Sequence, residues 1–168
     1  MLDSKSQVLS GWGRYPLAKA RVFSVESIQE TQEMITAKNE SSLARGLGRS
    51  YGDAAISSIA NVLSTNKLKR VSGFDNDSGV LRCEPGLSFE ELLCQYLEQG
   101  WFSLVTPGTK FVTMGGALAS DVHGKNHCQV GSFVDSVKSF KLLTASGDLV
   151  TCSRELEPEL FWATAGGM

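Results

Sequence analysis

The segment RGLGRSYGD, residues 45–53, restricts what this chain can form more strongly than any other stretch. Its glycines are Gly46, Gly48 and Gly52. Three glycines within seven residues exclude a regular helix or strand, and they let backbone N–H groups point together into a concave, anion-binding surface. Arg49 adds a positive charge and Ser50 a hydroxyl donor. The loop predicts a diphosphate site, with a glycine-rich surface turn as the alternative.

The familiar nucleotide-binding loops do not match this chain. The Rossmann pattern G-x-G-x-x-G needs a third glycine where Tyr51 stands. The phosphate loop of nucleoside triphosphatases would end at Gly124 and Lys125, but it requires a glycine at Ala119 and a serine or threonine at Asn126. A nucleoside triphosphatase is therefore disfavoured.

A second glycine-rich loop covers residues 107–116. Its glycines permit close backbone approach, and its threonines supply hydroxyl groups. These residues are Gly108, Thr109, Thr113, Gly115 and Gly116. A single phosphate needs only one such loop. Two loops in one small chain therefore favour a dinucleotide with a long, flat ring system.

The segment HGKNH follows and contains both histidines of the chain, His123 and His127, around Lys125. Histidines four residues apart share a helical face and can bind metal, but Gly124 disfavours a helix and no third ligand stands nearby. We therefore predict no metal site. His123 and Lys125 are expected to face a substrate, since histidine moves protons near neutral pH and lysine neutralises anions. His127 is expected to bond loop backbone.

Composition narrows the class of protein. The 168 residues are 42% hydrophobic and 20% charged, which is typical of one globular domain. A net charge of −2 provides no basic surface for nucleic acid. The four cysteines form no C-x-x-C pair, no secretion signal precedes them and no apolar run reaches the length of a membrane span. A cytoplasmic protein with reduced thiols is expected.

Periodicity and turn signals predict a mixture of helices and strands. Serines followed three residues later by glutamate indicate helix starts at Ser27 and Ser88. The helices are expected at residues 28–38, from 89 to a cap at Gly100, and at 155–163. Strands are expected at residues 41–45, 61–68 and 102–105, with hairpins joining 70–74 to 80–84 and 139–144 to 149–152.

Taken in order, RGLGRSYGD, PGT, VTMGGALASDVHGKNH, GSF and ELFWATAGG resemble the FAD-binding domain of the vanillyl-alcohol oxidase and p-cresol methylhydroxylase superfamily, in particular its decaprenylphosphoryl-ribose 2′-oxidase branch. The resemblance covers residues 12–167 and implies an α+β fold of two lobes with the FAD diphosphate between them. Residues 1–168 would form this FAD-binding domain. A substrate domain is expected C-terminal to residue 168.

The resemblance also assigns residues. The diphosphate region would be bound by Gly48, Arg49, Ser50, Tyr51, Gly52, Gly108, Thr109, Thr113, Gly115 and Gly116. Further along the cofactor would lie Ala119, Asp121, Gly124 and Asn126. His123 and Lys125 match positions that border flavin and substrate. Several oxidases of the superfamily have a histidine bonded to the flavin where this chain has Arg49, so FAD is expected to bind non-covalently.

The implied reaction is oxidation of a secondary alcohol on a sugar-type substrate, which includes a sugar linked to a polyprenyl phosphate, with hydride transfer to flavin N5. A membrane lipid is thus one conceivable substrate. The isolated domain is not expected to complete this reaction alone. Two alternatives stay open at this point: a sugar-alcohol or aldonolactone oxidase of the same superfamily, and a nucleotide-binding module without catalysis.

Overall fold

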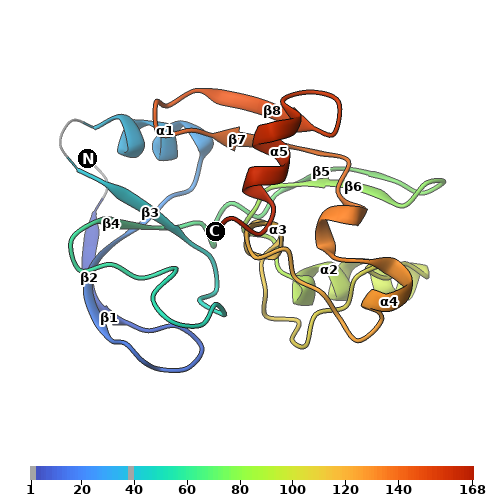
Figure 1. The fold of residues 1–168 in the computed structure, drawn as a ribbon, viewed down its shortest axis with the longest axis horizontal. Helices are drawn as coiled ribbons and strands as arrows, with labels where there is room; N and C mark the ends of the chain where they lie inside the picture. Colours follow the sequence, from blue (N-terminus) through green and yellow to red (C-terminus); the bar gives the residue numbers. More distant parts are fainter. Residues whose placement is uncertain (1–2, 38–39) are drawn as a thin grey trace.

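The computed structural model describes residues 3–37 and 40–168 and shows an α+β fold, as the sequence predicts. The N-terminal part is a four-stranded sheet in the order β1-β2-β4-β3 (Figure 1). Its strands are β1 (Ser4–Leu9), β2 (Ala18–Ser24), β3 (Ser42–Arg45) and β4 (Asn61–Ser64). The β1–β2 pair is antiparallel, whereas β2, β4 and β3 run parallel.

The parallel strands determine where the first glycine-rich loop lies. Arg45 is paired with Ser64 at the carboxyl ends of β3 and β4, and the Thr65 N–H donates to the Arg45 carbonyl at 3.0 Å. Ligands of open sheets with parallel strands bind beyond these carboxyl ends. Residues 46–60, which connect β3 to β4, leave the sheet at that edge.

The remaining elements form a second group around two hairpins (Figure 1). One hairpin joins β5 (Val71–Asp75) to β6 (Val80–Cys83), and the other joins β7 (Ser139–Leu143) to β8 (Leu149–Ser153). The helical segments of this group are α2 (Phe89–Tyr96), η1 (Leu97–Gln99), α3 (Met114–Ala119), α4 (His127–Val130), η2 (Phe133–Ser136) and α5 (Pro158–Thr164). A core of Val134, Cys152 and Phe161 unites η2, β8 and α5.

The predicted helix starts are confirmed, with one difference between them. Ser88 caps α2 through a complete capping box: its Oγ accepts from the Glu91 N–H at 3.2 Å, and the Glu91 carboxylate accepts from the Ser88 N–H at 3.0 Å. Ser27 caps α1 (Ile28–Thr36) in the same way, but the Glu30 carboxylate bonds the N–H of Glu26 instead. The predicted extension of α1 reaches Lys38, which lies outside the described residues.

Several predicted boundaries are wrong. Residues 102–105 form no strand, because the Leu104 carbonyl is bonded by the Asn126 side-chain amide rather than by a neighbouring strand. Strand β4 stops at Ser64, four residues before the predicted end. Helix α5 begins at Pro158 instead of residue 155, because Ser153 Oγ accepts from two following N–H groups and holds a turn there.

The sequence did not predict β1, β2 or α3. Strand β1 is polar and exposed over most of its length, so it has no inward-facing pattern. Helix α3 contains two glycines, which disfavour helix, yet the Thr113 side chain caps it by accepting from the Gly116 N–H at 3.1 Å. Within the described residues, no helix is long and apolar enough to cross a membrane.

The four cysteines are predicted to differ in reactivity. Burial, reinforced by the Glu84 charge, raises the pKa of the Cys83 thiol to about 11, and burial also raises the pKa of Cys152. Cys94 and Cys128 are exposed. Because the thiolate is the reactive form, a chromogenic disulfide reagent at neutral pH should modify Cys94 and Cys128 rapidly and the other two only after unfolding.

The double variant Cys94→Ser/Cys128→Ser is the matched control for this titration. It should show almost no rapidly reacting thiol in the folded state and two thiols in denaturant. A third rapidly reacting thiol in the parent chain would contradict the packing around Cys83 or Cys152.

Candidate functional site

The two glycine-rich loops lie against each other. We call residues 45–53 the first glycine loop and residues 107–116 the second glycine loop. A Cβ atom placed on Gly46 would lie 2.5 Å from the Oγ1 atom of Thr113, closer than any real contact. The Thr113 side chain is itself buried. The first loop therefore needs a glycine at this point so that its backbone can touch the second loop.

A pocket of about 390 Å³ opens beside the first glycine loop. It is lined by Ser10, Gly11, Trp12, Arg14, Arg45, Leu47, Gly48 and Arg49. Three of these residues are arginines and none is acidic. The lining therefore produces a positive potential over a small volume, which is the electrostatic signature of an anion site.

Of the three arginines, Arg45 is the one whose side chain is bonded to two other segments of the chain. Its guanidinium donates to the Ala55 carbonyl at 2.9 Å and to the Ser10 carbonyl at 2.8 Å. Burial and the adjacent positive charge of Arg49 hold the pKa of Arg45 below its usual value. Gly48 has φ +66°, and a Cβ there would collide with this guanidinium. Arg45 and Gly48 thus fix the floor of the pocket together.

Arg49 bridges three segments of the chain. Its guanidinium carbon lies 5.3 Å from the ring centroid of Trp12 and 5.8 Å from that of Phe111, which belongs to the second loop. Its Nη1 group donates to the Leu47 carbonyl at 3.1 Å, but its Nε atom is buried without a hydrogen-bond partner among the described residues. Buried donors are normally satisfied, so the unpartnered Nε of Arg49 is an exception among the described residues.

The backbone of the first loop offers further donors. No hydrogen bond to another described residue is made by the N–H groups of Leu47, Gly48, Arg49 and Ser50. The loop is held in place from outside instead, because the Trp12 N–H donates to the Ser50 carbonyl at 2.8 Å. Four consecutive N–H groups without a protein partner match the donor set that a phosphate oxygen requires.

The second loop is anchored by the segment before α2. The Gly115 N–H donates to the Pro85 carbonyl and the Met114 N–H to the Leu87 carbonyl, both at 2.8 Å. A Cβ on Gly115 would lie 2.8 Å from Pro85 Cβ, so this glycine serves close packing. Gly116 donates to the Thr113 cap. These predicted site residues hold the second loop in position against the first.

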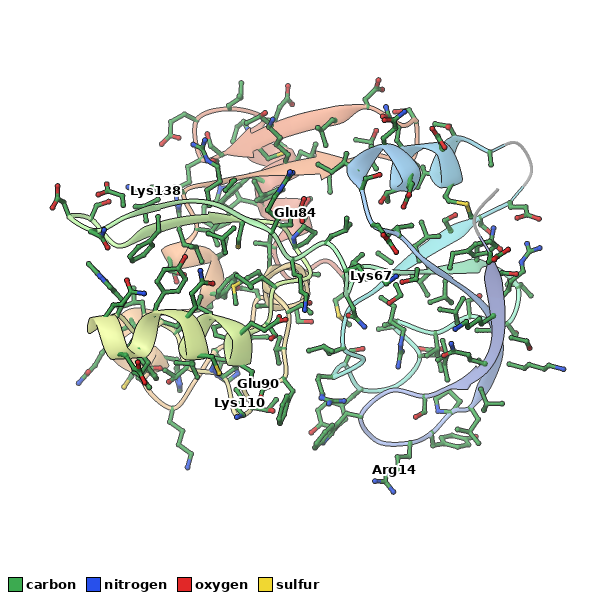
Figure 2. The ribbon with its side chains drawn as sticks, turned by 180° about the vertical axis from the view of Figure 1, so that it is seen from behind. Arg14, Lys67, Glu84, Glu90, Lys110 and Lys138 are labelled. Atoms are coloured by element: carbon green, nitrogen blue, oxygen red, sulfur yellow. The ribbon has the colours of Figure 1, made fainter. Side chains whose placement is uncertain are left out.

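Lys110 of the second loop is not free to serve the pocket. It forms an ion pair with Glu90 of α2 at 2.9 Å, and Figure 2 shows the two side chains side by side. The Glu90 carboxylate raises the pKa of Lys110 above its usual value. The remaining predicted residues of this loop, Gly108 and Thr109, donate no backbone hydrogen bond to the described residues, and Thr109 Oγ1 accepts from the Phe111 N–H at 3.2 Å.

The predicted residues after α3 are mostly engaged within the fold. Asp121 accepts from Ser132 Oγ at 2.7 Å and from the Val134 N–H at 2.9 Å. Gly124 is buried, and a Cβ there would overlap the Thr106 carbonyl. Asn126 bonds the Leu104 carbonyl at 2.9 Å. The Ala119 carbonyl accepts from the Met168 N–H at 3.0 Å.

His123 and Lys125 are exposed, as a substrate-facing pair requires. The His123 and His127 rings meet edge to face, with centroids 5.2 Å apart. His127 Nδ1 lies 3.0 Å from the Gly124 carbonyl, which confirms the predicted bond to loop backbone. Across the described ranges, no three His, Cys, Asp or Glu side chains gather in a way that could hold a metal ion.

Sequence reasoning left open whether Trp12 and Tyr15 cap the cofactor or only pack, and Trp12 does line the pocket. It missed the lining residues Ser10, Gly11, Arg14, Arg45 and Leu47, and also Phe111, which contacts Arg49. Trp12 and Arg14 belong to the connection between β1 and β2, two strands that the sequence did not predict. Arg45 could have been predicted, since it is the first residue of RGLGRSYGD. A basic residue at a strand end next to glycines indicates an anion site. Nothing in the sequence indicated that Phe111 contacts Arg49.

The arginine-lined pocket has the charge and the donors of an anion site, and comparison with known proteins specifies the class of the domain. The model of the FAD binding domain family matches residues 16–153. Decaprenylphosphoryl-beta-D-ribose oxidase of Mycolicibacterium smegmatis is 39% identical over 168 residues, which cover 95% of this chain and 36% of that protein. L-gulonolactone oxidase of Scyliorhinus torazame is 27% identical over 141 residues, which cover 83% of this chain and 31% of that protein.

An FAD-linked oxidoreductase of Aspergillus terreus is 34% identical over 122 residues, which cover 72% of this chain and 24% of that protein. The chain therefore spans about a third or less of the length of these curated relatives. The match to the family model covers well over half of the chain. The chain belongs to the FAD-binding domains of the PCMH type, and the resemblance seen in its motifs is confirmed.

Two glycines of the first loop provide a matched test of its geometry. Gly48 and Gly52 both have positive φ, but a Cβ on Gly48 would strike Arg45 whereas none of the described atoms lies within 4 Å of a Cβ on Gly52. Gly52→Ala should cost about 1 kcal/mol of unfolding free energy, for the left-handed backbone alone. Gly48→Ala should cost at least about 1 kcal/mol more, because the guanidinium is displaced.

Urea unfolding of the two variants measures both costs under the same conditions. Equal losses of stability would mean that Arg45 shifts without cost, and that its two carbonyl contacts do not fix the floor of the pocket.

Proposed function

We propose that this chain binds FAD non-covalently, with the diphosphate in the arginine-lined pocket, as part of a flavin-dependent oxidoreductase. The observation that carries the proposal is the donor set of that pocket. Arg14, Arg45 and Arg49 line it without a carboxylate, and the first loop adds four N–H groups that have no partner in the described protein. Such a set fits two linked phosphates better than one.

The pocket also fits the group in size and shape. About 390 Å³ lies within the range of ligand pockets and admits a diphosphate with part of a nucleoside, while the rest of FAD would extend past it. Arg49 itself is one of the residues that line it. In this proposal the N-terminal sheet and the hairpin-containing part are the two lobes of the family fold. The diphosphate lies in the pocket of the N-terminal part, and the rest of the cofactor extends toward the second glycine loop.

The residues divide into two kinds of contribution. Direct contacts to the cofactor are proposed for Gly46, Gly48, Arg49, Ser50, Tyr51, Gly52, Gly108 and Thr109. A positioning contribution is proposed for Thr113, Gly115, Gly116, Ala119, Asp121, Gly124 and Asn126. The second group already bonds or packs within the fold, so these residues would shape the site rather than donate to the ligand.

Arg49 is the reason for proposing a non-covalent flavin. A guanidinium stays protonated and is not a nucleophile at neutral pH. Stacked between Trp12 and Phe111, it stabilises the loops through their aromatic faces instead. The site therefore relies on charge and hydrogen bonds to retain its cofactor.

When bound, the flavin supplies the hydride acceptor for oxidation of an alcohol carbon. The chain's own share is to bind and orient. His123, exposed next to the buried Gly124, is proposed to handle or orient the hydroxyl proton of the substrate. Lys125, two residues further on, is proposed to donate to a phosphate or hydroxyl of the substrate.

We propose a sugar-type secondary alcohol as the substrate class, supplied to a separate substrate domain that completes the active site. The similarity to a decaprenylphosphoryl-beta-D-ribose oxidase along 95% of this chain supports that class and admits a polyprenyl-phosphate-linked sugar. The weaker similarity to an L-gulonolactone oxidase supports an aldonolactone as the second candidate. Without a substrate domain, residues 1–168 would act as a nucleotide-binding module only.

Binding is tested by titrating the chain with FAD and following quenching of flavin fluorescence. Arg14→Gln should weaken binding about tenfold, because one of the three positive charges that line the pocket is lost. Lys138→Gln is the control, since Lys138 lies on the opposite side of the molecule from Arg14 (Figure 2). Inorganic pyrophosphate should compete with FAD in the parent chain.

Acid precipitation of the loaded protein checks the type of attachment in the same samples. All yellow colour should stay in the supernatant. Colour retained in the pellet would exclude non-covalent binding, and equal affinity of the two variants would remove the pocket from the site.

The proposal for Lys125 is tested in a protein that joins this chain to its substrate domain. Lys125→Ala should raise KM for a phosphate-bearing or hydroxyl-rich substrate about tenfold or more, since one ionic contact is lost, and should leave the visible flavin spectrum unchanged. Unchanged turnover with an unchanged KM would show that Lys125 does not contact the substrate.

A further inference from the structure

The hairpin formed by β1 and β2 differs in charge from the rest of the chain. Residues 3–24 contain four basic side chains and one acidic one, whereas residues 25–168 contain 12 basic and 17 acidic. The basic residues are Lys5, Arg14, Lys19 and Arg21. Arg21 is paired with Glu40 at 2.7 Å, but the other three have no acidic partner within 4.0 Å among the described residues. A net acidic protein thus carries one basic projection.

Residues 10–17, which connect these two strands, carry several exposed apolar side chains. Tyr15 is 81% exposed, Leu17 66% and Trp12 53%, and Val8 at the end of β1 is 67% exposed. Val8 is paired directly opposite Lys19, so both side chains lie on the same face of the hairpin. Figure 2 shows Arg14 at the tip, pointing away from the body of the molecule. Aromatic, aliphatic and basic groups are therefore concentrated on one projection.

The cofactor does not account for this exposure. Trp12 and Arg14 line the pocket, and a ligand there would cover part of them. Tyr15, Leu17 and Val8 do not line it. The loop is also held in a defined shape, since the Trp12 N–H bonds the Ser50 carbonyl and the Arg14 N–H bonds the Gly11 carbonyl. Its outer apolar groups are thus presented on a fixed support.

We propose that this hairpin tip docks the protein on an anionic lipid bilayer. Tyrosine and tryptophan are favoured at the headgroup level, where their rings lie among the acyl chains and their polar atoms face water. Unpaired lysine and arginine next to them are attracted by the negative surface potential of anionic lipids. The combination of Tyr15 and Leu17 with Arg14 and Lys19 matches both requirements, and it complements a negative surface rather than a neutral one.

Docking at this tip has a geometric consequence for the site. The loop that would meet the bilayer also lines the proposed cofactor pocket through Trp12 and Arg14. A lipid-linked substrate would then reach the protein from the side on which the pocket opens. This last link rests on the proposed function, whereas lipid docking itself requires no flavin and no substrate.

The test is co-sedimentation of the 168-residue chain with vesicles made of equal parts phosphatidylcholine and phosphatidylglycerol. The parent chain should bind these vesicles, should bind pure phosphatidylcholine weakly, and should be released by added salt. Tyr15→Ser/Leu17→Ser should lower the partition constant about tenfold or more, because two apolar side chains no longer enter the interface. The matched control is Leu97→Ser/Leu149→Ser, which removes two exposed leucines from the other part of the molecule.

Reversing the charge of one lysine tests the electrostatic part of the docking separately, because the apolar side chains of the tip stay in place. Lys19→Glu should weaken binding about tenfold, and Lys138→Glu, at an exposed lysine distant from the hairpin, should not. The proposal is overturned if the parent chain binds neither type of vesicle. It is also overturned if the two hairpin variants bind as well as the two control variants do. Self-association of the chain that the tip variant abolishes, without any lipid binding, would assign the tip to a second copy and also overturn it.

Because the vesicles and the protein are mixed without FAD, the outcome is separate from that of the cofactor titration. Lipid binding with no FAD binding would leave the docking surface in place and remove the proposed function. FAD binding with no lipid binding would do the reverse.

Discussion

The contact between Gly46 and Thr113 is the constraint on which the site depends. At 2.5 Å from the Thr113 hydroxyl, a Cβ on residue 46 has no room, so the two loops touch only because one contributes bare backbone. Thr113 at the same time caps α3, and α3 is fixed to the Pro85 and Leu87 carbonyls. One close approach therefore connects the carboxyl edge of the four-stranded sheet to the elements around α2.

Arg49 completes that connection by a different physical means. The glycine contact is steric and tolerates no substitution, whereas the guanidinium between Trp12 and Phe111 holds three segments through polarisable ring faces. Its charge is directed to the pocket at the same time. The same guanidinium thus supports the loops and lines the pocket.

Local signals in the sequence predicted the parts of the fold that local chemistry determines. The capping box at Ser88 and the turn between β7 and β8 depend on residues a few positions apart, and both are present. Strand β2 pairs with the distant β4, and β1 pairs only with β2, so no local pattern reveals either strand. In the site, the glycines and Arg49 could be predicted because they are neighbours in the single motif RGLGRSYGD. Trp12 and Phe111 reach Arg49 from distant segments, so only the folded chain shows their contact with it.

The juxtaposition of Arg45 and Arg49 affects the energetics of the free protein. Burial and, after it, the nearby charge of Arg49 lower the pKa of Arg45, and no carboxylate lines the pocket to offset the two charges. Mobile anions would screen that repulsion, whereas they weaken the surface ion pairs. The folded state consequently gains most from a multivalent anion that stays in place. A ligand that binds this pocket only in the folded protein would therefore stabilise the domain by mass action.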